Sequence, residues 1–178
     1  VEQLPDGDLR NGLLYSLAVQ WAREDPTAAA GWVLDQIPEG RNREAALQVI
    51  VWNWTLQNAA AAEQWATSQS DPSVRENAMA TAAQALATVD PAAAAAFVTQ
   101  IPAGDARNNA LETVTYRWAQ QDLEAASAWA LALPAAAGQD YAVFQVGAGR
   151  ARASVDAALA WAEQQPAGAL RDSALGGV

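Results

Sequence analysis

Arginine recurs at an almost fixed interval in this chain, and a guanidinium group could bind anions. The series is Arg10, Arg43, Arg75, Arg107, Gln139 and Arg171, with steps of 33, 32, 32, 32 and 32 residues. A guanidinium can hold a carboxylate or a phosphate through two parallel hydrogen bonds. It can equally bridge to a loop carbonyl or to a nearby Asp, such as Asp25, Asp90 or Asp122. Both interpretations stay open, a row of anion sites or a structural bridge.

A second set of positions could bind a ligand because aromatic groups stand among polar ones. Positions five and nine after each arginine position vary between repeats, and residues four apart share one helix face. Together with Tyr141 they form a candidate binding stripe: Tyr15, Val19, Gln48, Trp52, Gln84, Glu112, Tyr116, Tyr141 and Phe144. An aromatic beside a helical core can also be the edge of that core. Edge packing and a ligand-facing stripe both remain possible.

The residue types for common catalysis are missing from the sequence. There is no His and no Cys, which removes the commonest general base, soft metal ligands and thiol nucleophiles. Among 20 carboxylates, no pair stands out, and Asp25, Asp71, Asp90 and Asp122 fall where helix caps are expected. No D-x-D-x-D-G calcium loop is present. We therefore expect no enzyme activity, no metal and no cofactor.

Large aromatic residues keep the same period as the arginines. One series is Trp32, Trp65, Phe97, Trp129 and Trp161. Another is Trp21, Trp54, Leu86, Trp118 and Arg150. A fixed period of this length is typical of a solenoid built from stacked repeats. We place the repeats approximately at residues 5–37, 38–69, 70–101, 102–133 and 134–165, with a partial repeat at 166–178, in a single domain over 1–178.

Each repeat holds the pattern of two helices. After Arg43, apolar or small residues recur three, four, seven, eight and eleven places on, which is one buried helical stripe. The second helix begins near Asp25-Pro26 or Asp90-Pro91, carries Ala-Ala-x-x-aromatic, and ends near a proline such as Pro38. Alanine lets helices approach closely, so we expect the rings to be buried between them. The sequence predicts an all-α solenoid of about five antiparallel helical hairpins, with a right-handed superhelix.

The repeat resembles the bacterial helical-hairpin arrays of the tetratricopeptide and HEAT-like α-solenoid class. More narrowly, it is similar to an uncharacterised W-A-x-x-D-P-x-x-A-x-x-W-x-x-x-L/I-P-x-G-x-x-R array. The matching residues are Trp21-Ala22, Asp25-Pro26, Trp32, Ile37-Pro38, Gly40, Arg43 and Ala46-Leu47. The period and the Trp, Gly and Pro positions depart from the tetratricopeptide consensus, so no peptide-carboxylate clamp is carried over. The resemblance implies a scaffold that binds other macromolecules.

Charge and hydropathy restrict the partners. The net charge is −10, and nucleic acid binding needs a basic footprint, so we expect no nucleic acid partner. No stretch of 18 apolar residues lacks a charge, so we expect no membrane insertion. The printed chain starts without Met, and we interpret it as a processed product or a piece of something longer. An exported or periplasmic bacterial protein is the favoured setting.

Three hypotheses of function follow from these patterns. The first is a non-catalytic scaffold that binds a peptide or protein on the concave face. The second is a structural subunit that stacks end to end with itself, because open solenoid ends expose apolar helix faces. The third is glycan binding, with Trp52 and Tyr116 stacking on sugar rings.

The fifth repeat departs most from the others. It places Gly147 and Gly149 inside a predicted helix and carries Arg150 where other repeats have Trp or Leu. The V-G-A-G-R segment lacks the Lys and the preceding strand of a phosphate loop. Close packing or a kink explains the glycines best, with a distorted binding unit as the alternative.

Overall fold

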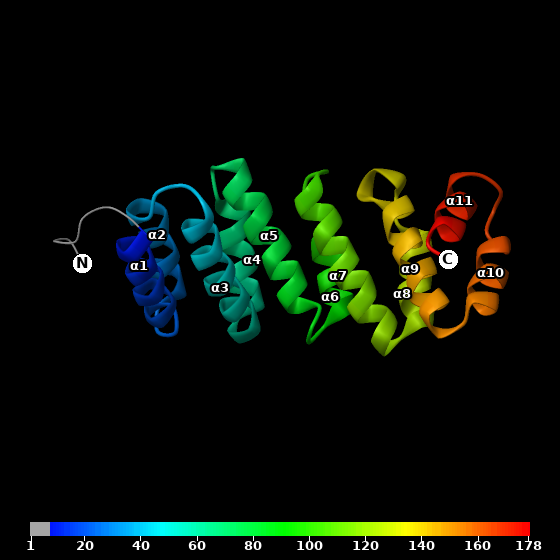
Figure 1. Cartoon of the computed structure of the whole chain (residues 1–178), viewed down its shortest axis with the longest axis horizontal. Helices are drawn as coiled ribbons and strands as arrows, with labels where there is room; N and C mark the ends of the chain where they lie inside the picture. Colours follow the sequence, from blue (N-terminus) through cyan, green and yellow to red (C-terminus); the bar gives the residue numbers. More distant parts are fainter. Residues whose placement is uncertain (1–7) are drawn as a thin grey trace. The chain divides into compact units, whose positions relative to one another are not determined.

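The computed structural model describes residues 8–178, and every regular element within that range is helical. Consecutive helices run as hairpins, as Figure 1 shows. The elements are α1 (Asp8–Trp21), α2 (Pro26–Gln36), α3 (Arg41–Gln57), α4 (Ala59–Ser68), α5 (Pro72–Leu86), α6 (Pro91–Val98), α7 (Asp105–Gln121), α8 (Leu123–Ala132), η1 (Ala135–Ala137), α9 (Gln139–Ala153), α10 (Val155–Glu163) and α11 (Ala169–Gly176). The all-α prediction is confirmed.

The second helix of each hairpin begins at a polar residue seven places before the repeat's aromatic. In every case the side chain accepts a hydrogen bond from the backbone N–H three residues on, which satisfies one of the free donors of the first turn. The five capping residues are Asp25, Asn58, Asp90, Asp122 and Ser154. The Asp caps were expected from the sequence, and Asn58 and Ser154 fill the same place.

The first helices α3 and α7 each start after a glycine whose backbone conformation only glycine adopts without strain. Gly40 and Gly104 precede α3 and α7 with φ of 131° and 159°. A side chain disfavours such positive φ values. Each glycine follows a proline by two residues, and the proline ends the preceding helical segment. The Pro-x-Gly segment therefore turns the chain from one hairpin into the next.

The fifth repeat makes this turn differently. Ala136 stands two residues after Pro134, where Gly40 and Gly104 stand after Pro38 and Pro102. An alanine disfavours positive φ, and the segment forms the short 3₁₀ helix η1 instead. Gly138, with φ of 92°, then supplies the left-handed residue before α9.

The helices pack in two compact units, Val1–Ala85 and Leu86–Val178, and α5 spans the boundary. In the first unit, α1 contacts α2 and α3, and α3 contacts α2 and α4. In the second, α7 contacts α6, α8 and α9, while α9 contacts α8, α10 and α11. Neighbours along the chain and first helices of adjacent hairpins therefore make most of the contacts. The predicted repeat at 5–37 begins before the described residues, and the single-domain assignment stays a prediction.

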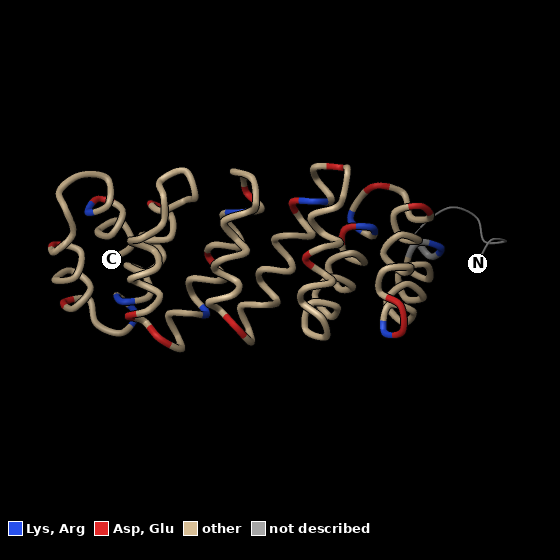
Figure 2. Tube along the Cα trace, turned by 180° about the vertical axis from the view of Figure 1, so that it is seen from behind, with Lys and Arg blue, Asp and Glu red and all other residues tan. Residues whose placement is uncertain are grey.

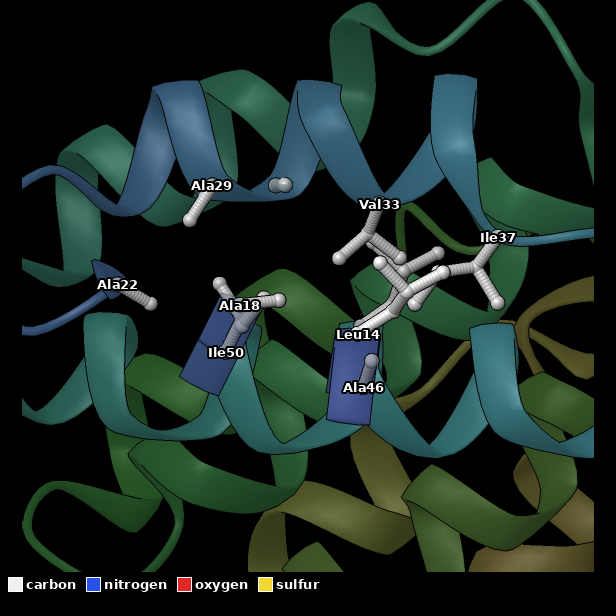
Figure 3. Packing of buried hydrophobic residues seen from close by; sticks show 10 residues of the cluster. Leu14, Ala18, Ala22, Ala29, Val33, Ile37, Ala46 and Ile50 are labelled. Carbon is white, nitrogen blue, oxygen red and sulfur yellow. The ribbon is translucent and has the colours of Figure 1, made fainter. Parts of the chain in front are cut away.

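Small side chains fill the crossings between helices in the first unit. Leu14 and Ala18 of α1 share one buried cluster with Val33 of α2 and with Ala46 and Ile50 of α3. In Figure 3, the side chain of Val33 on α2 points toward Leu14. All of these except Leu14 are almost fully inaccessible to water, and Leu14 is nearly so. Alanine at the crossings brings the backbones close, and branched residues fill the remaining space.

The two aromatic series of the repeat meet inside the hairpins. Trp21 lies against Trp32, Trp54 against Trp65, and Trp118 against Trp129, with ring centroids 6.3, 5.9 and 5.6 Å apart. In the fifth hairpin Arg150 replaces the first ring, and its guanidinium carbon lies 4.9 Å from the Trp161 centroid. Each of these four hairpins is thus closed by a ring pair or by a cation over a ring.

The expectation that all the rings are buried is wrong for most of them. Trp54 and Phe97 are buried, but Trp32, Trp65, Trp129 and Trp161 are half-buried and Trp21 is exposed. The rings pair with one another within a hairpin and do not fill the space between hairpins. Buried alanine and branched aliphatic residues, rather than the rings, fill the space between hairpins.

Gly147 marks a close approach between α9 and α11. A Cβ placed on Gly147 would lie 2.5 Å from the backbone oxygen of Ala174. A Cβ on Gly149 would lie 3.7 Å from the Cβ of Ala119, which is ordinary contact. The helix α9 continues unbroken through both glycines. Close packing is therefore the role of Gly147, and Gly149 has no such constraint.

Gly147→Ala is expected to destabilise the protein by about 1–3 kcal/mol, because the backbone of α11 would have to move. Gly149→Ala is the matched control on the same helix, and we expect it to be neutral or to stabilise by up to about 1 kcal/mol. Chemical denaturation followed by circular dichroism measures both. Equal effects of the two substitutions would contradict the close approach.

Trp54→Ala should cost about 3–5 kcal/mol of unfolding free energy, because the ring is buried and leaves a cavity. Trp21→Ala, at the equivalent position in the first hairpin, should cost clearly less because that ring is exposed. Thermal melting of both variants provides the comparison, and a smaller effect at Trp54 would rule this account out.

Candidate functional site

The arginines at the start of the first helices bind loop carbonyls six residues earlier in the chain. Arg43 donates from Nε to the oxygen of Ile37 at 2.6 Å, and Arg75 donates from Nη1 to that of Gln69 at 3.0 Å. Arg171 donates to the oxygen of Gln165 from Nε at 2.9 Å and from Nη2 at 2.6 Å. These carbonyls follow helix ends, where backbone acceptors are free and the helix dipole is negative.

The negative C-terminal end of the preceding helix offsets the unfavourable position of each arginine at the positive N-terminal end of its own helix. The loop-carbonyl interpretation therefore describes Arg43, Arg75 and Arg171. Arg43 also lies 3.8 Å from the exposed carboxylate of Glu39, a pair that water screens. These guanidinium groups tie one hairpin to the next and are committed to the backbone. Arg10 lies half-buried in α1.

The fourth and fifth members of the series use different acceptors. Arg107 donates from Nη1 to the oxygen of Ala136 in η1, 29 residues later, at 2.9 Å. Its Nε–H is buried and has no hydrogen-bond partner. Gln139 donates from Nε2 to the oxygen of Leu131 at 2.7 Å. The altered turn at η1 thus changes both bonds, and Arg107 reaches forward into it.

Arg150 is held by two side chains of the preceding hairpin. Its Nη2 lies 2.8 Å from Oε1 of Glu124 and 2.9 Å from Oγ of Ser127, both on α8. Together with the Trp161 ring, these contacts hold a side chain that is mostly covered. Arg150 departs from the repeat in sequence, but the repeat pattern does not predict this bridge because both partners on α8 are more than twenty residues away.

In the first unit, the candidate stripe lies along the first helices beside the core. Tyr15 and Val19 of α1 are half-buried, and Tyr15 packs against the buried cluster. On α3, Gln48 is exposed and Trp52 is half-buried. Gln84 lies half-buried in α5. The aromatic side chains of Tyr15 and Trp52 are thus partly covered, as the edge-packing interpretation requires.

The second unit places four stripe residues on two neighbouring helices. Glu112 and Tyr116 lie on α7, and Tyr141 and Phe144 lie on α9, which packs against it. The exposed fraction is 41% for Tyr116 and 39% for Phe144. The Tyr141 hydroxyl lies 3.3 Å from Oε2 of the exposed Glu112 and donates to it. We call these four residues and Arg152 the α7–α9 patch.

Arg152 completes this patch and was not predicted from the sequence. Its guanidinium carbon lies 5.2 Å from the ring centroid of Tyr116. Partial burial raises the pKa of Tyr141, the side chain of Gln145 opposes that shift, and the negative charge of Glu112 adds to it. Tyr141 is therefore a neutral hydrogen-bond donor at ordinary pH. The patch offers two accessible rings, one free carboxylate oxygen and one cation stacked on a ring.

The first unit holds an open pocket of about 350 Å³ between α1 and α3. Its apolar walls include Val19, Ala22 and Ile50, and polar groups come from Arg23 and Asn53. The amide of Asn53 already donates to the Val49 oxygen of its own helix. The pocket borders the stripe at Val19, so the first helices of this unit are hollowed where they meet.

Acidic groups are spread along helix ends and connecting loops, as Figure 2 shows. Burial raises the pKa of Glu63, and no neighbouring charge contributes to that shift. The residues that the structure describes hold no group of three or more acidic side chains that could bind a metal ion. No helix among residues 8–178 is both long enough and apolar enough to cross a membrane.

Comparisons with protein-family models, with curated proteins and with solved structures find no match to this chain. The candidate site is therefore described by its own geometry. Among the sequence-predicted residues, the structure brings Glu112, Tyr116, Tyr141 and Phe144 onto one helix pair.

Arg43→Ala is expected to cost about 1.5–3 kcal/mol of stability, the usual size for a hydrogen bond to a charged group. Arg41→Ala, in the same turn of α3 but exposed, should stay within about 0.5 kcal/mol of the parent. Urea unfolding of both variants measures the difference. No difference between them would remove the structural role of the arginine series.

Proposed function

We propose that this chain is a non-catalytic interaction scaffold that binds a peptide or protein on the face formed by the first helices of its hairpins. The hairpins stack into a right-handed α-solenoid of about five repeats with a period of 32–33 residues. Support comes from the packing within each unit. There the first helices of adjacent hairpins contact each other, while the second helices described make no comparable contacts.

That difference in packing supports an assignment of the concave side. Helices on the inside of a curved stack lie closer together than those on the outside. The first helices α1 and α3, and likewise α7, α9 and α11, are the closely packed layer. In this proposal they line the concave side, where solenoids usually bind their partners.

The observation that carries the proposal is the pair of exposed rings in the α7–α9 patch. Tyr116 and Phe144 are each more than a third exposed, on adjacent helices of the first-helix layer. Exposed aromatics flanked by polar groups are typical of binding surfaces, where they bury large areas with little loss of side-chain freedom. Tyr15 and Trp52 are more covered, and they support the core edge in the first unit.

The charges of the patch indicate the chemistry of the partner. Glu112 is exposed, and it is joined to Tyr141 by only one of its two oxygens. The chain carries a net charge of −10, which steers basic segments toward it. A peptide with an aromatic or aliphatic side chain next to a Lys or Arg satisfies both features. The rings take the apolar group, and the carboxylate takes the cation.

The test is a synthetic peptide array that varies apolar and charged residues independently. Peptides that combine a Lys or Arg with a neighbouring apolar residue should bind best. The double variant Tyr116→Ser/Phe144→Ser should lose at least about tenfold in affinity, equal to about 1.4 kcal/mol. Because the two rings are only 41% and 39% exposed, thermal melting must show that the variant is still folded at the temperature of the binding assay.

Leu56→Ser is the matched control, since Leu56 is an exposed apolar residue on a first helix outside the candidate stripe. It should bind peptides like the parent. An array without any enriched peptide class would argue against the proposal, as would equal loss of binding in the control.

A further inference from the structure

Two opposite charges of the α7–α9 patch are each held by a tyrosine from the neighbouring helix. Oε2 of Glu112 on α7 accepts a hydrogen bond from the Tyr141 hydroxyl on α9 at 3.3 Å. The guanidinium carbon of Arg152 on α9 lies over the Tyr116 ring on α7, 5.2 Å from its centroid. The packing of α7 against α9 therefore fixes one anion and one cation on the same surface.

The two charges lie at different heights along the helix pair. The helices α7 and α9 run in the same direction, because α8 leads the chain back between them (Figure 1). Glu112 and Tyr116 share one face of α7 and are separated by about 6 Å along its axis. Tyr141 lies in the first turn of α9, and Arg152 lies in its last turn. The carboxylate is therefore held toward the start of the pair and the guanidinium toward its end, with ring surface between them.

The patch is a side surface of packed hairpins. The helix α7 contacts α6, α8 and α9, and α9 contacts α8, α10 and α11. Tyr116 remains 41% exposed although α9 packs beside it. The accessible groups of the patch are therefore those that helix packing within the second unit leaves open.

The Arg152 guanidinium is available to a ligand. Its side chain is exposed, and no carboxylate or carbonyl oxygen among residues 8–178 accepts a hydrogen bond from it. Arg150, two residues earlier, is instead committed to Glu124 and Ser127. A ring covers one flat face of a guanidinium and leaves the N–H groups at its edge free to donate. Because the ring restricts Arg152, less freedom is lost when it binds a carboxylate through two hydrogen bonds.

The Glu112 carboxylate is available in the same sense. Its side chain is exposed, Tyr141 bonds one oxygen, and the other accepts no hydrogen bond from the part of the chain that the structure describes. An ionised carboxylate is a strong acceptor for the side chain of a Lys or Arg. Within the same described residues, no ion pair joins Glu112 to Arg152, so neither charge is used up by the other.

We propose that the α7–α9 patch binds a bipolar peptide segment, in which a Lys or Arg meets Glu112, an Asp or Glu meets Arg152, and apolar residues between them contact the rings. This inference rests on the proposed peptide binding at the patch and specifies its partner. It has a consequence that net charge alone does not have. A chain of net charge −10 favours the most basic peptide, whereas the patch favours a segment whose charges cancel.

Four synthetic peptides of equal length test the proposal. They carry Lys-Leu-Phe-Glu, Lys-Leu-Phe-Gln, Gln-Leu-Phe-Glu or Lys-Leu-Phe-Lys between uncharged Gly-Ser flanks, with both termini blocked. In an extended chain the two outer residues of each core are about 10 Å apart, which leaves room for the apolar residues on the rings. Fluorescence anisotropy at about 0.15 M salt, where net charge is screened beyond about 8 Å, measures their affinities. The Lys-Leu-Phe-Glu peptide should bind at least about threefold more tightly than each of the others.

Protein variants assign each preference to one residue. Arg152→Gln should abolish the preference for Glu over Gln at the last position and keep the preference for Lys at the first. Glu112→Gln should do the reverse, and the two cycles of protein and peptide substitutions isolate each pair. Tyr141→Phe should reduce the preference for Lys only, because Tyr141 acts by positioning Glu112.

Arg117→Gln is the matched control, because it removes the same charge from an exposed residue of α7 outside the patch. It should change the four affinities by a common factor. Thermal melting should show that all the variants remain folded.

Different outcomes separate this inference from the proposed function. Equal affinities for the Glu and Gln peptides, or tightest binding of Lys-Leu-Phe-Lys, would overturn the bipolar partner and leave peptide binding in place. Equal effects of Arg152→Gln and Arg117→Gln on the preference for Glu would do the same. Failure of all four peptides to bind would overturn peptide binding at the patch, and the bipolar partner with it.

Discussion

Close approach of helices at single methyl groups is the constraint on which the two units depend. Ala18, Ala46 and Ala110 are completely buried on first helices, and Ala29 and Ala126 on second helices. A methyl group at a crossing allows two backbones to come near, and any larger group would separate them. At Gly147 even a methyl group is too large, because α11 passes against the α9 backbone there. Branched residues fill the remaining gaps, and aromatic rings close each hairpin at its edge.

Because the helices pack closely, the loops must make sharp turns and also provide hydrogen-bond acceptors. Closely packed helices need sharp turns, and a Pro-x-Gly segment provides them where glycine adopts positive φ. Arg43, Arg75 and Arg171 then bond to the carbonyls left free at the preceding helix ends. Where the glycine is missing, at Ala136, the turn becomes a 3₁₀ helix and Arg107 bonds forward to it. One substitution in a loop thus changes the hydrogen bonds of two hairpins.

The same packing separates the surfaces available for binding. Side chains at the crossings are committed to the core, and the repeated arginines are committed to loop carbonyls. Residues beside the crossings are free to differ between repeats, and in the α7–α9 patch they include exposed rings and a carboxylate.

The sequence by itself determined the helical class, the period, the Asp caps and the proline boundaries, because each depends on residues close together in the chain. It also located Glu112, Tyr116 and Phe144 as candidates from their variation between repeats, and Tyr141 from its place beside Phe144 in the fifth repeat. Only the tertiary structure decided that Tyr116 and Phe144 are accessible while Tyr15 lies against the core. The Arg152 contact with Tyr116 and the Arg150 bridge to Glu124 were likewise invisible to the pattern. The exposure of a side chain and the bridges between helices depend on which helices pack together, and those helices can be tens of residues apart in the sequence. Local periodicity does not contain that information.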